Sequence, residues 1–210
     1  MKKLGYSSAQ IYDAPEKQVA REELHSILGQ ERDGNLLILP GPRDYETRTA
    51  VKNGWALDHI FLVDKTAAVL ALHTRNFTER ERPLLQKYTG LVSDVASRLA
   101  RRGRRITAAH IDFCQPIFAL TASEPVIEIP KFVRSGIMDE GLLAITILSG
   151  REQDGCAGNA ERYRRMEGLV KRGLKLATIP RTASNIHQGD YINPRSNNKM
   201  LWAVFEIRRK

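Results

Sequence analysis

Residues 36–64 read LLILPGPRDYETRTAVKNGWALDHIFLVD, and this stretch decides the fold. Its two ends, residues 36–40 (LLILP) and 60–63 (IFLV), are short continuous apolar runs bounded by turn residues. Such runs are typical of strands that are covered on both faces of a sheet. The polar segment between them opens with Gly41-Pro42 and closes at Gly54, which is the asymmetry expected of a helix. We therefore predict a strand, a helix and a second strand.

The same alternation continues along the rest of the chain. Further strands are predicted at 88–92, 106–113, 141–148, 174–179 and 200–207. Further helices are predicted at 15–29, 66–73, 94–102 and 157–172. Short apolar strands that alternate with helices favour an α/β fold with a mainly parallel sheet.

One connection breaks this alternation. Residues 180–199 separate the last two predicted strands, are rich in Ser, Asn, Pro and Gly, and show no helical pattern. Strands that are joined without a crossover helix pair antiparallel. We therefore predict an α/β fold with a mainly parallel seven-stranded sheet, helices on both faces and an antiparallel last strand. Residues 1–30 are expected to form an N-terminal helical extension, and residues 31–210 a Rossmann-like domain.

The composition is that of a globular protein. The chain has 210 residues, of which 42% are hydrophobic and 27% charged, which argues against a disordered tail, a collagen or a coiled coil. Lys and Arg number 33 against 24 Asp and Glu, so the formal net charge is +9. A surplus of this size favours a polyanionic partner.

The cysteines and the chain start indicate the compartment. Cys114 and Cys156 are too few for a disulfide framework or, by themselves, a structural zinc site, so we expect a reduced cytoplasmic protein and no metal. Met1-Lys2-Lys3 is not followed by the apolar core of a secretion signal. No run of 18 apolar residues occurs, so no membrane partner is expected. The oligomeric state stays open.

Polar residues follow several predicted strands, at the sheet edge where α/β proteins bind their ligands. A glycine at the first strand-to-helix turn, Gly41, lets a ligand approach the backbone. Asp64 ends the second strand 23 residues later, where an acid can accept the ribose hydroxyls of an adenosine. The alternative is that Gly41 only makes a turn and Asp64 only caps the next helix.

The whole pattern from residue 36 to residue 207 resembles the class I S-adenosylmethionine (SAM)-dependent methyltransferases. LLILPGPRDYE stands at the family's first motif, IFLVDK at the second, LVSDV at the third and HIDFCQP at the fourth. The resemblance implies SAM as the cofactor. The cofactor-binding residues that it implies are Pro40, Gly41, Asp64, Lys65, Ser93, Asp94 and Asp112.

The chain departs from that family in two motifs. The usual E/D-x-G-x-G-x-G is reduced to Pro40-Gly41-Pro42, and the fourth motif is not the D/N-P-P-Y/F of enzymes that methylate amino groups of adenine or cytosine. The methyl acceptor and its target atom therefore stay open.

Two residues of the fourth motif are catalytic candidates. Asp112 could orient or deprotonate an attacking amine or hydroxyl, or it could cap the following loop. Phe113-Cys114-Gln115 resembles the P-C-Q motif of cytosine-C5 methyltransferases, in which a thiolate adds to the ring. The E-N-V and Q-R-R motifs of those enzymes are absent, and a buried structural cysteine is the alternative. His110 is expected to be a buried structural histidine on the same strand face as Asp112.

Basic residues are clustered along the sequence. Clusters of arginine and lysine neutralise phosphates, although they also occur as solvated helix faces. The 181–199 segment, predicted as a loop, carries Arg181, His187, Tyr191 and Arg195, a mixture suited to hydrogen bonding and stacking. Together with this loop, the residues expected to contact RNA or DNA are Arg98, Arg101, Arg102, Arg104 and Arg105.

Three functions are consistent with these observations. The first is a SAM-dependent methyltransferase that acts on nucleic acid or another anionic substrate. The second is a catalytically inactive, methyltransferase-like module that binds nucleic acid. The third is a nicotinamide-dependent dehydrogenase, but the absence of G-x-G-x-x-G and the antiparallel last strand disfavour it.

Overall fold

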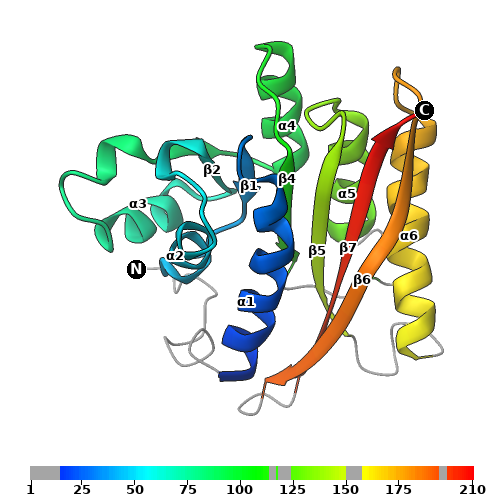
Figure 1. Ribbon diagram of the computed structural model, residues 1–210, viewed down its shortest axis with the longest axis horizontal. Helices are drawn as coiled ribbons and strands as arrows, with labels where there is room; N and C mark the ends of the chain where they lie inside the picture. Colours follow the sequence, from blue (N-terminus) through cyan, green and yellow to red (C-terminus); the bar gives the residue numbers. More distant parts are fainter. Residues whose placement is uncertain (1–14, 114–116, 118–123, 150–157, 194–197) are drawn as a thin grey trace.

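A computed structural model describes residues 15–113, 117, 124–149, 158–193 and 198–210. It contains a seven-stranded sheet in the order β3-β2-β1-β4-β5-β7-β6 (Figure 1). The first five strands pair in parallel, and β7 pairs antiparallel with both β5 and β6. The strands are β1 Leu36–Ile38, β2 Ile60–Asp64, β3 Gln86–Thr89, β4 Ala108–Phe113, β5 Gly141–Leu148, β6 Arg181–Asn193 and β7 Asn198–Arg209. The predicted fold class is confirmed.

Helices cover both faces of this sheet. Successive residues of β1 point to opposite faces, so Leu37 joins one buried core while Leu36 and Ile38 join the other. The first core lies under α4, α5 and α6, and the second under α1, α2 and α3. The helices are α1 Pro15–Leu28, α2 Tyr45–Lys52, α3 Ala67–Arg75, α4 Val92–Arg101, α5 Glu124–Arg134 and α6 Asn159–Lys175, with short 3-10 turns at Gly29–Glu31, Leu57–His59 and Arg82–Leu84. No helix among the described residues is long and apolar enough to cross a membrane.

The sixth strand lies elsewhere than predicted. Residues 174 and 175 of the predicted strand 174–179 belong to α6, because Met166, Val170 and Leu174 recur at helical spacing and are buried together. Gly173, which resembles a helix stop, is instead a point of close approach. A Cβ there would lie 2.7 Å from the backbone oxygen of Pro130 in α5. The prediction of a strand at 174–179 is therefore wrong.

Most of the predicted 181–199 loop is also strand. Its first thirteen residues form β6, and its last two, Asn198 and Lys199, begin β7; residues 194–197 lie outside the described part of the chain. This strand lies at the edge of the sheet, and most of its described side chains are exposed or half-buried, so polar residues are tolerated there. Its backbone hydrogen bonds are made with the apolar strand β7. Gly189 makes room for the Trp202 ring, which would lie 2.5 Å from a Cβ at this position.

Two smaller differences concern strand β3 and helix α5. The third strand ends at Thr89 instead of residue 92, because Gly90 adopts a φ of 141° and α4 already begins at Val92. No element is predicted between 114 and 140, yet α5 forms there around Pro130. A proline inside a helical pattern normally ends the helix, which hides α5 from sequence reasoning.

A candidate ligand site at the carboxyl edge of the sheet

A cleft with a volume of about 270 Å³ opens at the carboxyl ends of β1, β2, β3 and β4. This is the edge at which open α/β sheets bind their ligands. Helices α1, α2, α4 and α5 also contribute to its wall. It is lined by Lys17, Arg21, Leu39, Pro40, Gly41, Arg43, Tyr45, Glu46, Asp64, Lys65, Gly90, Val92, Asp112, Phe113 and Glu124.

The turn after β1 brings the backbone to the cleft. Gly41 adopts a φ of 63°, a left-handed conformation that favours glycine, and Pro40 before it is buried. Both residues line the cleft. A ligand can therefore approach this turn without meeting a side chain at position 41.

Asp64 lies at the end of β2 and fits both interpretations of its role. Its Oδ1 accepts a hydrogen bond of 2.8 Å from the backbone amide of Thr66, as a capping residue does, and the same side chain lines the cleft. Burial raises the pKa of Asp64, although the hydrogen bond from Thr66 acts in the opposite direction. Lys65 also lines the cleft and pairs with Glu124 Oε2 at 2.6 Å.

Ser93 and Asp94, on the first turn of α4, are not among the lining residues. Ser93 is buried, and its amide donates to Glu128 Oε2 at 3.1 Å, while its hydroxyl has no hydrogen-bond partner among the described residues. Asp94 is exposed. Of the seven residues expected to bind the cofactor, the structure thus brings five to one cleft and leaves these two outside it.

Asp112, near the end of β4, lines the cleft. Its Oδ2 accepts from Lys17 Nζ at 3.3 Å, and its Oδ1 is buried with no hydrogen-bond partner in the described part of the protein. Tyr191, expected in a loop, belongs to β6 and lies beside Lys17 and Asp112; burial raises the pKa of its hydroxyl. Cys114, the other catalytic candidate, lies outside the described residues.

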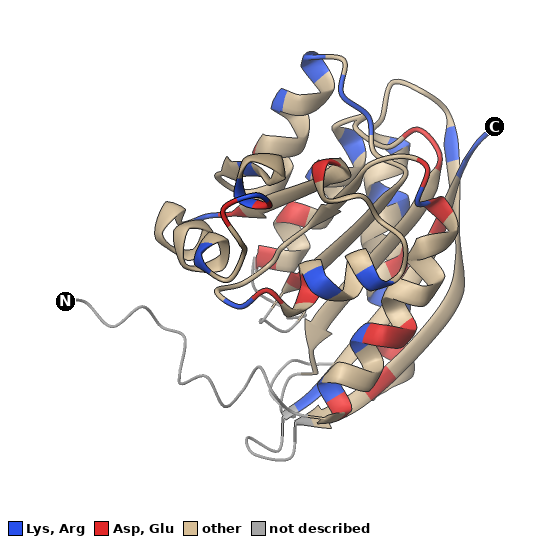
Figure 2. Ribbon diagram, turned by 60° about the vertical axis from the view of Figure 1, so that its left-hand side comes forward, with Lys and Arg blue, Asp and Glu red and all other residues tan. Residues whose placement is uncertain are grey.

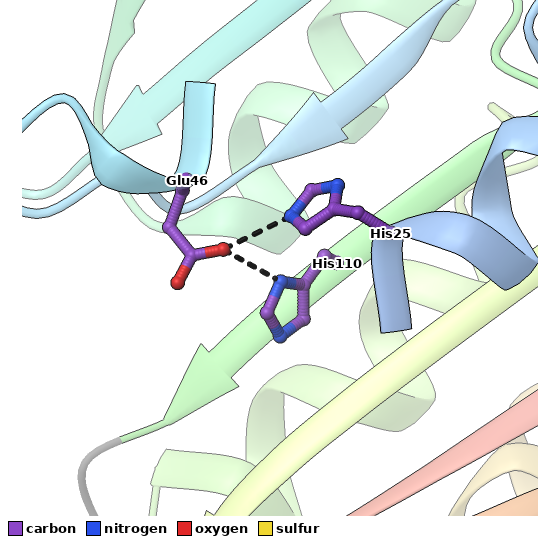
Figure 3. Close-up of side chains that lie close together, drawn as sticks. All are labelled: His25, Glu46 and His110. Atoms are coloured by element: carbon purple, nitrogen blue, oxygen red, sulfur yellow. Dashed lines mark hydrogen bonds and ion pairs between the residues drawn. The ribbon is translucent and has the colours of Figure 1, made fainter. Parts of the chain in front are cut away.

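Close to Asp112 lies a buried polar network, formed by Arg21, His25, Glu46 and His110, that was not predicted from the sequence (Figure 3). Glu46 of α2 accepts hydrogen bonds from Arg21 Nε at 2.6 Å and His25 Nε2 at 3.0 Å, both on α1. Its Oε2 also lies 3.3 Å from Nδ1 of His110 in β4. The signal was present, because Lys17, Arg21 and His25 recur every fourth residue and so share one face of α1.

The charges of this network balance. Burial alone would raise the pKa of Glu46, but the charge of Arg21 and the hydrogen bonds from His110 and His25 hold it well below its usual value. Burial lowers the pKa of His25, so this imidazole is neutral at pH 7. The two imidazoles donate to a carboxylate whose charge Arg21 neutralises.

The same three residues form a candidate donor set for a metal. One ligand atom each from His25, Glu46 and His110 lies within 4.8 Å of the others, and two imidazoles with a carboxylate suit zinc and related ions. Arg21, however, already neutralises Glu46. A divalent cation would therefore add uncompensated positive charge to a buried site, which is energetically costly. The geometry favours a structural network over a metal centre.

Comparisons with known proteins match the fold alone. No protein-family profile matches the sequence, and no curated protein matches it. A Streptococcus mutans protein assigned as a SAM-dependent methyltransferase superposes with a TM-score of 0.61 at 15% identity, over 91% of this chain and 48% of that one. The chain has the class I methyltransferase fold. It spans about half the length of the Streptococcus mutans protein.

Two further structures with the class I methyltransferase fold match most of both chains. An O-methyltransferase from Bacillus cereus, in complex with S-adenosylhomocysteine (SAH), superposes with a TM-score of 0.57 at 11% identity over 96% of this chain and 93% of that one. A Pyrococcus horikoshii protein assigned as an RNA methyltransferase superposes with a TM-score of 0.58 at 12% identity, over 100% of this chain and 90% of that one. At such identities no residue role is transferred.

Proposed function

We propose that this protein is a SAM-dependent methyltransferase that acts on nucleic acid. The observation that carries the proposal is the cleft, which brings Gly41, Asp64 and Asp112 together at the carboxyl edge of a class I methyltransferase fold. Its volume of about 270 Å³ is close to the lower end of the range for small-molecule sites. The Bacillus cereus structure, which holds SAH in the same fold, supports this choice of cofactor.

The residues of the cleft fit an adenosine-containing cofactor. In the proposal, the carboxylate of Asp64 accepts hydrogen bonds from the ribose hydroxyls, as an acid at this position does in related sheets. The turn at Gly41 allows close approach to the backbone, and Lys65 lies next to Asp64 at the rim. When bound, SAM supplies a methyl group on a positively charged sulfur, which is activated for transfer.

Asp112 is the proposed catalytic residue. Its buried Oδ1, without a hydrogen-bond partner among the described residues, is available to accept a hydrogen bond from an amine or hydroxyl of the acceptor. It would orient that group and take its proton. Lys17 holds the other oxygen, which fixes the direction of the carboxylate. Most of the rate enhancement would come from this positioning.

The acceptor is assigned from charge. The net charge of +9 favours a polyanion, and the similarity to a protein assigned as an RNA methyltransferase supports RNA as the first acceptor to test. The alternative, an inactive module that binds nucleic acid, is favoured by one observation. The glycine-rich first motif is reduced to Pro40-Gly41-Pro42, which leaves one glycine at the turn.

Calorimetric titration with SAM, SAH and NAD separates these functions. We expect saturable binding of SAM and SAH but not of NAD. Absence of SAM binding up to 1 mM, an affinity of about −4 kcal/mol, would leave the inactive module. Binding of NAD alone would indicate a dehydrogenase.

Variants of Asp64 test the assignment of the cleft. Asp64→Asn keeps an oxygen that can accept from the Thr66 amide but loses the charge, and we expect SAM to bind at least about ten-fold more weakly. Asp94→Ala is the matched control, because this acid is exposed and outside the cleft. Weakening by Asp94→Ala instead of Asp64→Asn would contradict the proposed site.

A further inference from the structure

The edge of the sheet opposite the cleft carries a cluster of basic residues. Helix α4 leads into β4 and helix α6 leads into β6, so both helices end at the amino edge of the parallel strands. Strand β7 runs antiparallel to β5 and therefore also ends at this edge. Figure 1 shows the end of α4 and the C terminus at the same end of the molecule. Figure 2 shows lysine and arginine along the end of α4 and, together with acidic residues, beside the C terminus.

A groove with a volume of about 480 Å³ lies at this edge, between the last turn of α6 and the start of β6. Four cationic residues line it, and no described lining residue is acidic. The cleft at the other edge differs, because there Glu46, Asp64, Asp112 and Glu124 accompany the cations. The cationic residues of the groove are Lys171, Lys175, Arg181 and Lys210.

Arg181 is the buried member of this set and is 6% exposed. Its guanidinium donates to the backbone oxygens of Met138 and Val133, and its Nε is buried without a hydrogen-bond partner among the described residues. The nearby carboxylate of Asp139 pairs with Arg209 at 2.7 Å and with Arg105 at 3.5 Å. Arg181 therefore has neutral carbonyl hydrogen-bond partners and shares the charge of Asp139 with two other arginines, so a bound anion would add to the countercharge of this buried cation.

The distribution of the cations suits a chain of phosphates better than a single anion. Lys175 and Lys210 are exposed in the groove, and Arg209 and Arg105, which share the one carboxylate of Asp139, lie from the end of β7 toward the start of β4. Repeated phosphates neutralise such a row of charges one after another, whereas a single small anion meets only a few of them.

We propose that this basic groove binds the phosphate backbone of a nucleic acid, at the sheet edge opposite the methyl-transfer cleft. The choice of nucleic acid over another polyanion rests on the proposed function, whereas the site itself rests on the buried Arg181 and the lysines that line the groove with it. The groove holds the acceptor without reading its sequence, because its lysine contacts are to phosphate and not to bases.

The experiment measures binding in the absence of SAM. A labelled single-stranded RNA of about 20 nucleotides and a DNA of the same sequence are titrated by fluorescence anisotropy at several salt concentrations. The groove variant is Lys175→Gln/Lys210→Gln, which spares the buried Arg181 and so preserves folding. The control variant is Arg75→Gln/Arg80→Gln, two exposed cations outside the groove.

We expect both nucleic acids to bind the wild type with similar affinity. Each lost phosphate contact lowers the salt dependence by about 0.7, so the groove variant should lose about 1.4 from the slope of log K against log salt. At 0.1 M salt the same loss corresponds to roughly 25-fold weaker binding. The control variant should bind like the wild type.

Several results would overturn this proposal. Equal effects of the groove and control variants would show that only the net charge matters, and a preference for phosphatidylserine vesicles over nucleic acid would show a membrane surface instead. The failure of the proposed function is separate. The groove variant should keep its affinity for SAM. Nucleic-acid binding without SAM binding by the wild type rejects only the methyltransferase, and SAM binding with unchanged nucleic-acid binding by the groove variant rejects only the groove.

Discussion

Replacing Arg21 by methionine leaves the carboxylate of Glu46 buried without its cation. The Arg21 and Glu46 side chains are 3% and 8% exposed and 2.6 Å apart, and removing one partner of such a pair costs about 3–5 kcal/mol. The hydrogen bonds from His25 and His110 remain, so we expect the lower end of this range, about 3 kcal/mol. For a chain of this length that loss lowers the Tm by roughly 6–12 °C.

A double-mutant cycle isolates the interaction. The variants are Arg21→Met, Glu46→Gln and the two together, and urea unfolding followed by circular dichroism gives the free energy of unfolding of each. Either single change leaves one buried charge, whereas the double change leaves none. We therefore expect the double variant to be less destabilised than the sum of the two single variants, with a coupling free energy of about 2–3 kcal/mol.

The pH dependence of the same cycle tests the role of His25. Without Arg21, the unpaired carboxylate favours protonated His25, so the folded-state pKa of this histidine rises. A raised histidine pKa adds stability at low pH that is lost as pH rises. The deficit of Arg21→Met relative to the wild type should therefore be smaller at pH 6 than at pH 8. Additive single effects, or a deficit that does not change with pH, would refute the described network.

Two further predictions concern stability. Burial lowers the folded-state pKa of His25 and His73, so the unfolded chain binds more protons below about pH 6.5 and the free energy of unfolding should fall as pH drops toward 5, by at most about 1.4 kcal/mol per pH unit for each histidine. Proton uptake on unfolding, measured by calorimetry in two buffers, checks this, and its absence would contradict the burial of both rings. Gly173→Ala should cost about 1–3 kcal/mol, because its Cβ would meet Pro130 and Val133 of α5. Gly168→Ala in the same helix meets nothing within 4 Å and should stabilise by about 0.5–1 kcal/mol, and equal urea midpoints would contradict the packing of α5 on α6.

The sheet could be predicted from sequence because its strands are covered on both faces. Runs such as 36–38 and 60–63 are apolar without interruption, and an interval long enough for a helix separates them. The edge strand β6 could not be predicted in this way. Its residues are polar, and its partner β7, not its own composition, determines its conformation. Gly173 contributed to the wrong prediction of a strand at 174–179. A glycine can mark the end of a helix or a close contact between two helices, and the sequence alone does not distinguish the two.

The candidate site could be predicted in part for a related reason. The carboxyl ends of parallel strands meet at one edge, so Gly41, Asp64 and Asp112 could be placed together from their strands alone. Asp94 could not, since its place depends on which face of α4 turns to the cleft. The spacing of Lys17, Arg21 and His25 places them on one face of α1, but their contacts with Glu46 depend on how α1 packs beside α2, which periodicity does not reveal.

The proposed groove and the proposed cleft at opposite edges together predict a minimum length for the acceptor. The eight residues of β5 span about 26 Å between the two edges, and a B-form duplex advances about 3.4 Å per base pair, which is more than the A-form duplex of RNA. An acceptor that occupies both sites must therefore be at least about eight base pairs long. Methyl transfer from labelled SAM should rise above this length in a series of RNA duplexes. The Lys175→Gln/Lys210→Gln variant should show no such rise, because it lacks the groove contacts. If the wild type methylates four-base-pair and twenty-base-pair duplexes equally well, the two edges do not act on one molecule.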